Sequence, residues 1–551
     1  MTEDSKEISI DLSSLKKLNW TYALLIILLI LGVYLRSYHL DFPSIGYHNM
    51  KENEYISEAI FFNEQGDFLH RRTYNFYGLE QGPGYFEEYA QPPLIPYMTT
   101  LFWKVTGEQL WVPRLIIMLF MLGSILTIYF VVKKLTKSEY MALLSSFLLT
   151  IMPLGVYFGR NVQPESPALL FILLAANFYL KWAENLDKKQ LLYTMLALSF
   201  AGMFKLTFLI IGLPFLFIFP YKKVIELFKH HKNEFFSQIK YFITGLLPFI
   251  IIQGIFEFTI IDPSKKNVEI SIARLSNVFD LNYWNRIWPS LGSYIADNYT
   301  WWFFWFAILG LVFAVIKYKS QLSKFLIGYV VAIPIYIGLL SSKIGGHSYY
   351  QMPFLPLICI LGAFFLYNVG AILKQAIKIK YIEFASLLLI LLTLGSVQAA
   401  NDRVWGTVFY GQDFLGEYLK TTLGPDERFA MYGHSQDQAV CTYARHRCGW
   451  VNSLDEFKEI EKTFSLRYIY VGDVGFEKLA SQDPLWVYIA DNYHIDLVGL
   501  MNINNNLVPR HFILKKGGKF NLAEIQGKQA QLAKTYDSKH GDISYYYITN
   551  G

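Results

Sequence analysis

Long apolar runs separated by short polar turns dominate the first 400 residues of the chain. A helix needs roughly 20 apolar residues to cross a bilayer, and fewer when flanking side chains reach the interface. Eleven runs meet or approach this length, and we predict a transmembrane helix for each. They are residues 19–36, 113–132, 140–158, 165–182, 190–204, 206–220, 241–261, 301–316, 324–341, 352–369 and 382–398. The fifth and sixth runs are short, and either one bent hairpin or two half-helices would fit them.

Lysines fall mainly on one side of this predicted bundle. If the N-terminus is cytoplasmic, every inner loop contains lysine, from Lys133 in the first to Lys380 in the last. The short outer turns contain only Arg160, Lys205 and Lys343. Because positive residues favour the cytoplasmic side, we predict a cytoplasmic N-terminus, and the eleventh helix then ends on the outer side of the cell membrane.

This orientation divides the chain into three parts. Residues 1–18 form a cytoplasmic tail, and residues 19–399 form a membrane domain with large outer loops at 37–112 and 262–300. In residues 400–551, strand-like runs alternate with helical patterns, which predicts a small extracytoplasmic α/β domain.

Composition agrees with a membrane protein. Hydrophobic residues make up 53% of the chain and charged residues 17%, against about 25% charged residues in soluble proteins. The net charge of +5 gives no reason to expect a nucleic-acid partner. The three cysteines do not form a disulfide scaffold, but Cys441 and Cys448 would lie on the outer side. There they can close a small disulfide loop, and two unpaired thiols are the alternative.

Carboxylates gather in the first outer loop. Glu52 and Glu54 begin a pattern typical of an amphipathic helix lying on the membrane interface. Helical geometry points these two side chains about 200° apart, so we expect only one of them to face the bundle. Glu87 and Glu88 precede a rigid Pro-Pro turn and would suit contact with a metal ion or a substrate.

Further polar residues occupy three outer turns close to the membrane. An arginine there is a natural phosphate clamp, a carboxylate suits a helix N-terminus, and a lysine at membrane depth indicates function. These residues are Arg160 and Glu165, Lys205, and Lys343 with His347 and Tyr349. Together with the carboxylates, they predict an outer-leaflet cavity for a substrate with a phosphate head group and a lipid tail.

In order and spacing, these residues resemble GT-C-fold glycosyltransferases of the protein-mannosyltransferase and aminoarabinose-transferase kind, which use polyprenyl-phosphate or dolichyl-phosphate sugars. The resemblance covers about residues 20–400. It rests on Glu52 to Tyr55, Gly66-Asp67, Gln91-Pro92-Pro93-Leu94, Gly107 through Arg114-Leu115, Arg160, Lys205 and His347 to Tyr350. Three positions depart from the family pattern. Lys51 stands where the first motif usually has Asp, unless a shift in register gives that place to Glu52 or Glu54. Glu165 stands at a position that is usually Asp, and Gln91 where the aminoarabinose transferases have Lys.

The resemblance implies transfer of a sugar from an outer-leaflet polyprenyl-phosphate donor to a glycan, lipid or protein acceptor of the cell envelope. It implies a carboxylate base, with Glu52 as our first choice and Glu54 as our second. The expected phosphate-binding residues are Arg160, Lys205, Lys343, His347 and Tyr349. Glu87 or Glu88 would hold Mg²⁺ or Mn²⁺, ions that prefer oxygen ligands. The alternatives are a lipid-linked glycan flippase or polymerase and a non-catalytic membrane scaffold.

Overall fold

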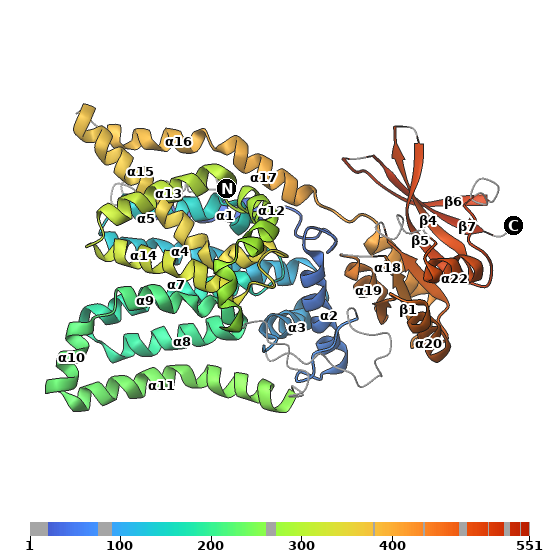
Figure 1. Ribbon diagram of the computed structural model, residues 1–551, viewed down its shortest axis with the longest axis horizontal. Coiled ribbons are helices and arrows are strands. Elements are labelled where there is room, and N and C mark those ends of the chain that lie inside the picture. Colours follow the sequence, from blue (N-terminus) through green and yellow to red (C-terminus); the bar gives the residue numbers. More distant parts are fainter. Residues whose placement is uncertain are drawn as a thin grey trace, which may run out of the picture.

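The computed structural model describes residues 20–74, 91–260, 272–377, 379, 381–433, 436–472, 482–504, 506–522, 529–539 and 541–549. A helical bundle and a C-terminal sheet domain lie at opposite ends of the long axis, with α2 and α3 between them (Figure 1). The helical class and the C-terminal α/β domain are therefore as the sequence predicts.

Helices occupy every predicted membrane run. The bundle elements are α1 (Trp20–Arg36), α4 (Trp111–Thr136), α5 (Glu139–Ile151), α6 (Pro153–Tyr157), α7 (Glu165–Asn185), α8 (Lys188–Phe204), η2 (Leu206–Ile211), α9 (Gly212–Phe217), α10 (Tyr221–His230), α11 (Lys232–Ile255), η3 (Phe256–Ile260), η5 (Ile272–Phe279), α12 (Leu281–Asn298), α13 (Thr300–Ile316), α14 (Gln321–Leu339), η6 (Ser348–Phe354), α15 (Leu355–Ile377), η7 (Ile382–Leu387), α16 (Leu388–Leu391) and α17 (Leu394–Gly406). The chain is a multi-pass membrane protein.

The structure does not confirm the predicted number of eleven spans. Within the described residues, six helices are long and apolar enough to cross a membrane, or up to eight if each of two bent helix pairs is one span. The difference arises because several runs are short or broken. Pro153 lacks a backbone N–H, so α5 ends at Ile151 and α6 begins a new helix. Lys205 is extended and separates α8 from the short η2 and α9, so the fifth and sixth runs form one helix followed by two short ones.

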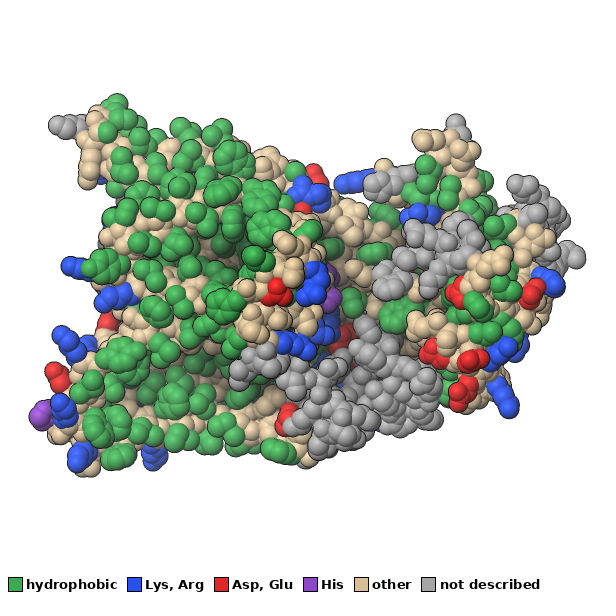
Figure 2. All heavy atoms as spheres, viewed as in Figure 1, with side chains coloured by type: hydrophobic (Ala, Val, Ile, Leu, Met, Phe, Trp, Pro, Cys, Tyr) green, Lys and Arg blue, Asp and Glu red, His purple; other side chains and the backbone are tan. Residues whose placement is uncertain are grey.

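Hydrophobic side chains cover the exposed surface of the bundle in Figure 2, as expected of a surface that faces lipid. Lysine and arginine side chains gather at its left edge, where Figure 1 places α10, at the end far from the sheet domain.

Two helices of the first outer loop, α2 (Asn49–Gln65) and α3 (Leu94–Thr106), connect the two ends of the molecule. The helix α2 ends at Gly66, whose φ of 70° is a left-handed conformation that glycine adopts without strain. The sequence predicted an amphipathic helix with one solvated face. Instead, α2 is buried on almost every side from Asn49 to Phe62, because the sheet domain covers the face that the bundle leaves open.

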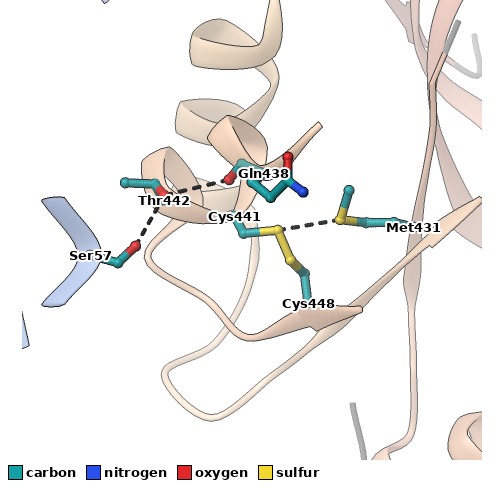
Figure 3. Close-up of a disulfide and its surroundings, with 6 residues drawn as sticks. All are labelled: Ser57, Met431, Gln438, Cys441, Thr442 and Cys448. Carbon is teal, nitrogen blue, oxygen red and sulfur yellow. Dashed lines mark hydrogen bonds between the residues drawn. A yellow bond between two sulfur atoms is a disulfide. The ribbon is translucent and has the colours of Figure 1, made fainter. Parts of the chain in front are cut away.

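The C-terminal domain contains one mixed sheet with strand order β2-β1-β3-β5-β4-β7-β6. The strand β1 pairs in parallel with β2 and β3, and the remaining pairs are antiparallel. The elements are α18 (Gln412–Thr422), β1 (Phe429–Tyr432), α19 (Gln438–Ala444), β2 (Cys448–Trp450), α20 (Leu454–Phe464), β3 (Tyr468–Val471), α22 (Pro484–Asn492), β4 (Tyr493–Ile503), β5 (Asn506–Lys516), β6 (Gln529–Tyr536) and β7 (Ile543–Thr549). A disulfide joins Cys441 in α19 to Cys448 in β2 (Figure 3).

Candidate functional site

One face of α2 carries a chain of paired charges. The Nζ atom of Lys51 lies 2.6 Å from Oε2 of Glu54. One turn further along the helix, Oε1 of Glu58 accepts hydrogen bonds from Nε and Nη2 of Arg71 at 3.0 and 2.5 Å. Arg71 also reaches Glu54, with 3.9 Å between Nη2 and Oε1. Burial raises the pKa of Glu58 to about 7 even though Arg71 opposes this change.

Glu52 has a different environment. Its two oxygens accept hydrogen bonds from Nε and Nη2 of Arg114, both at 2.9 Å, and the Ser44 hydroxyl donates a third at 2.8 Å. Burial alone would raise the pKa of Glu52, but Arg114 outweighs it and holds this pKa at about 2. A carboxylate held in this way is a weak proton acceptor, which argues against Glu52 as the base.

A second ion pair joins the start of α7 to the break after α8. Lys205 pairs with Oε1 of Glu165, which lies in the first turn of α7 as expected for a carboxylate at a helix N-terminus. The Nζ atom of Lys205 also lies 4.5 Å from the ring centroid of Tyr349 and 4.8 Å from that of Tyr350. Lys205 and Tyr349, predicted as members of one site, are therefore in contact.

The charges of three lysines act on His347, and we call these residues the lysine group: Lys51, Lys205 and Lys343. The His347 ring stacks on Tyr349 with 5.1 Å between centroids. Burial lowers the pKa of His347 to about 4, and the positive charges of the lysine group act in the same direction. His347 is therefore neutral at pH 7. Lys51 comes from α2, Lys205 from the break after α8, and Lys343 from the turn after α14.

Arg160 does not join the lysine group in the structure. Its guanidinium lies 4.4 Å from the ring centroid of Trp405, and Nη1 donates to the carbonyl oxygen of His39 at 3.1 Å. The strongest charges acting on it are those of Arg114 and Glu52. Trp405 in α17 and the His39 carbonyl therefore hold the Arg160 side chain, and its role as a phosphate clamp stays a prediction.

The described residues form no site for the expected Mg²⁺ or Mn²⁺ ion. Glu87 and Glu88 lie outside the described residues. Among those described, no group of three His, Cys, Asp or Glu side chains lies close enough to hold a metal. Glu54 and Glu165 each pair with a lysine instead.

An apolar groove begins next to Lys205. It has a volume of about 390 Å³ and lies between η2 and the end of α14. Its walls include Leu206, Ile210, Leu213, Tyr336 and Leu339. A groove of this chemistry at membrane depth accepts a hydrocarbon chain, and Lys205 at its end can bind an anionic head group.

Residues 90–255 match the family model described as dolichyl-phosphate-mannose-protein mannosyltransferase. Among solved structures, the apo oligosaccharyltransferase of Archaeoglobus fulgidus is 12% identical, with a TM-score of 0.55 over 90% of this chain and 75% of that one. ArnT from Cupriavidus metallidurans, bound to undecaprenyl phosphate, is 13% identical, with a TM-score of 0.52 over 90% of this chain and 97% of that one. This chain has a GT-C glycosyltransferase fold.

Two further findings complete the comparison. The archaeal oligosaccharyltransferase AglB from Archaeoglobus fulgidus in complex with an inhibitory peptide and a dolichol-phosphate is 11% identical, with a TM-score of 0.52 over 89% of this chain and 74% of that one. No curated protein sequence matches the chain significantly. The evidence for the GT-C fold therefore comes from similarity of structure, because the overall sequence identities are low.

Sequence reasoning gives no site role to three residues of this charged region. Arg71 carries no signal in the sequence, and Lys51 and Glu58 belong to the acidic cluster of the first outer loop without a role of their own. Glu58 lies four residues after Glu54, a spacing that places two side chains on one helix face. That spacing was a usable signal, whereas the pairing of Glu58 with Arg71 across a loop has no sequence signature.

Proposed function

We propose that this protein is a membrane glycosyltransferase that moves a sugar from a polyprenyl-phosphate donor to an acceptor of the cell envelope. The observation that carries the proposal is the meeting of Glu54, the lysine group and the apolar groove in one region of a GT-C fold. A base, an anion site and a lipid-sized groove are the parts that this reaction requires.

The lysine group binds the donor phosphate in this proposal. Cations close to the phosphate stabilise the charge that grows on it as the sugar leaves. Because Lys205 directly precedes η2, the prenyl tail of the same donor enters the groove between η2 and α14. Solved GT-C structures support this type of donor, since ArnT was solved with undecaprenyl phosphate and AglB with a dolichol-phosphate. Tyr349 and neutral His347 line the same site and can donate hydrogen bonds.

Glu54 is the general base. As the acceptor oxygen or nitrogen attacks the anomeric carbon, Glu54 takes the acceptor proton. The bond between the anomeric carbon and the phosphate oxygen breaks, its electron pair stays with the oxygen, and polyprenyl phosphate leaves. A single displacement of this kind inverts the anomeric configuration.

We place the site on the outer side of the membrane, with a cytoplasmic N-terminus. The basic edge of the bundle lies at the end far from the sheet domain, as the positive-inside rule requires for a cytoplasmic edge (Figure 2). The disulfide in the sheet domain is also typical of an oxidising compartment outside the cytoplasm.

The test is release of polyprenyl phosphate by the purified protein in lipid. A panel of radiolabelled polyprenyl-phosphate sugars would be supplied with a membrane extract as the source of acceptor. We expect release from at least one donor by wild type and none by Glu54→Gln. Absence of release from every donor, by a protein that still binds polyprenyl phosphate, would refute the transferase and leave a carrier or scaffold role.

A further inference from the structure

The face of α2 that points away from the lysine group packs on the C-terminal domain. With about 100° per residue, Asn49, Ile60 and Glu64 centre roughly 130° away from Glu54 and Glu58. The amide of Asn49 donates to Gln412 in α18 at 3.0 Å, and Ile60 belongs to the hydrophobic core that α2 shares with the sheet domain. The helix that carries the proposed base is therefore held between two domains.

Several contacts with α2 come from one short segment, residues 441–448. The disulfide Cys441–Cys448 closes it, and Figure 3 shows its Thr442 beside Ser57 of α2. The hydroxyl oxygens of Thr442 and Ser57 are 3.1 Å apart, which is a hydrogen bond in the middle of the helix. The backbone N–H of Cys448 donates to the carbonyl oxygen of Tyr74 at 3.1 Å.

Two further residues of the loop contact the two ends of α2. The hydroxyl of Tyr443 accepts a hydrogen bond from the backbone N–H of Ser44, just before α2, at 2.8 Å. At the other end, Arg445 lies 2.7 Å from Oε1 of Glu64 and also pairs with Glu108, before α4. The loop therefore contacts the start, the middle and the end of the same helix.

We propose that loop 441–448 positions α2, so that Thr442, Tyr443 and Arg445 hold Glu54 in its working place opposite the lysine group. The proposal rests on the function proposed above. In this proposal the three residues are positioning residues, and each acts through α2. The disulfide restricts the loop to few conformations, so little entropy is lost when its side chains engage the helix.

The first test compares Arg445→Met with Arg467→Met. Arg467 pairs with Glu427 at 2.5 Å within the sheet domain, so it controls for loss of an arginine ion pair. For Arg445→Met we expect kcat to fall about 10- to 100-fold, the range that a misplaced catalytic group produces. The KM for the donor should change less than kcat, because Lys205 and the groove belong to the bundle and only Lys51 of the lysine group moves with α2. Arg445→Lys should recover part of kcat, and Arg467→Met should behave as wild type.

The second readout needs no substrate. Amide hydrogen exchange of residues 49–65 should become faster in Arg445→Met and, to a smaller extent, in the milder variant Tyr443→Phe, while α4 and α7 stay protected. Unchanged exchange in both variants would overturn the positioning role, whether or not the wild type transfers a sugar. Faster exchange with unchanged kcat would overturn the link to catalysis. An inactive wild type refutes the proposed function alone, and the exchange measurement still decides whether the loop holds α2.

Discussion

Glu52→Gln separates a structural carboxylate from a catalytic one. The change keeps the shape of the side chain but removes the charge that faces Arg114, and both partners are almost fully buried, at 2% and 1% exposure. The amide oxygen of glutamine can accept one of the two hydrogen bonds from Arg114. The amide N–H group would face the other guanidinium donor and cannot accept from it. The variant therefore leaves a buried cation without its counter-charge.

Two independent routes give the size of the effect. The interactions of Glu52 lower its pKa from 4.5 to about 2, which corresponds to about 3 kcal/mol of folding free energy at neutral pH. Removal of one partner from a buried ion pair typically costs about 3–5 kcal/mol. We therefore expect Glu52→Gln to lower the free energy of unfolding by about 3 kcal/mol at pH 7.

The pH dependence has a definite sign. Because the folded-state pKa is lowered, the stabilisation by Glu52 is complete above about pH 4.5 and is lost as the pH falls towards 2. The difference between wild type and Glu52→Gln should therefore shrink over this range. Reversible unfolding in mixed detergent micelles would measure it at pH 7 and pH 3.5, alongside release of polyprenyl phosphate per folded molecule. A variant as stable as wild type but unable to release would refute this reasoning and return the base to Glu52.

Three further predictions concern the reaction itself. Glu54→Gln should reduce the rate of polyprenyl phosphate release about 10²- to 10⁴-fold, the usual contribution of a general base, while its free energy of unfolding stays like that of wild type. Full activity of this variant would exclude Glu54 as the base. Lys205→Met should raise the donor KM about 10- to 100-fold, because a charge-assisted contact with the phosphate is lost. The raised KM should persist in the double variant Lys205→Met/Glu165→Gln, in which the carboxylate left unpaired is removed. A KM that returns to the wild-type value in the double variant would show that Lys205 serves only to pair with Glu165. EDTA should leave the release of polyprenyl phosphate unchanged, because the described site carboxylates pair with cations. A loss of release that added Mg²⁺ restores, and that the variant Glu88→Gln reproduces, would contradict this prediction.

The sequence predicted the membrane architecture well because hydrophobic run length is a strong local signal. Each predicted run contains helix, and only breaks such as those at Pro153 and Lys205 change the count of spans. It predicted α2 as a helix but not its surroundings. The surroundings of Glu52 and Glu54 (solvent, bundle or sheet domain) depend on residues more than 300 positions away in the sequence. One example is the contact of Tyr443 with Ser44, two residues that are 399 positions apart in the sequence.

For the candidate site as well, the sequence predicted the general location of the residues but not all of their contacts. The contact between Lys205 and Tyr349 was expected from their shared outer location, and the structure contains it. Arg160 was expected in the same site by the same argument. Its side chain instead packs on Trp405, a residue that the sequence assigned to the start of another domain. Location on one side of a membrane restricts which residues can meet, but packing decides which of them do.

Lys51 changes the charge balance of the site as well as replacing an aspartate of the family motif. In the resting site, Lys51 neutralises Glu54 at 2.6 Å. In the proposed reaction, Glu54 loses its charge when it accepts the acceptor proton, and the departing phosphate gains one in the same step. Lys51 would then exchange one anionic partner for the other, so that no uncompensated charge appears in a partly buried site, where it would be costly. In that mechanism, a lysine beside the base couples proton removal to departure of the leaving group. An aspartate at this position would instead add a second negative charge next to Glu54.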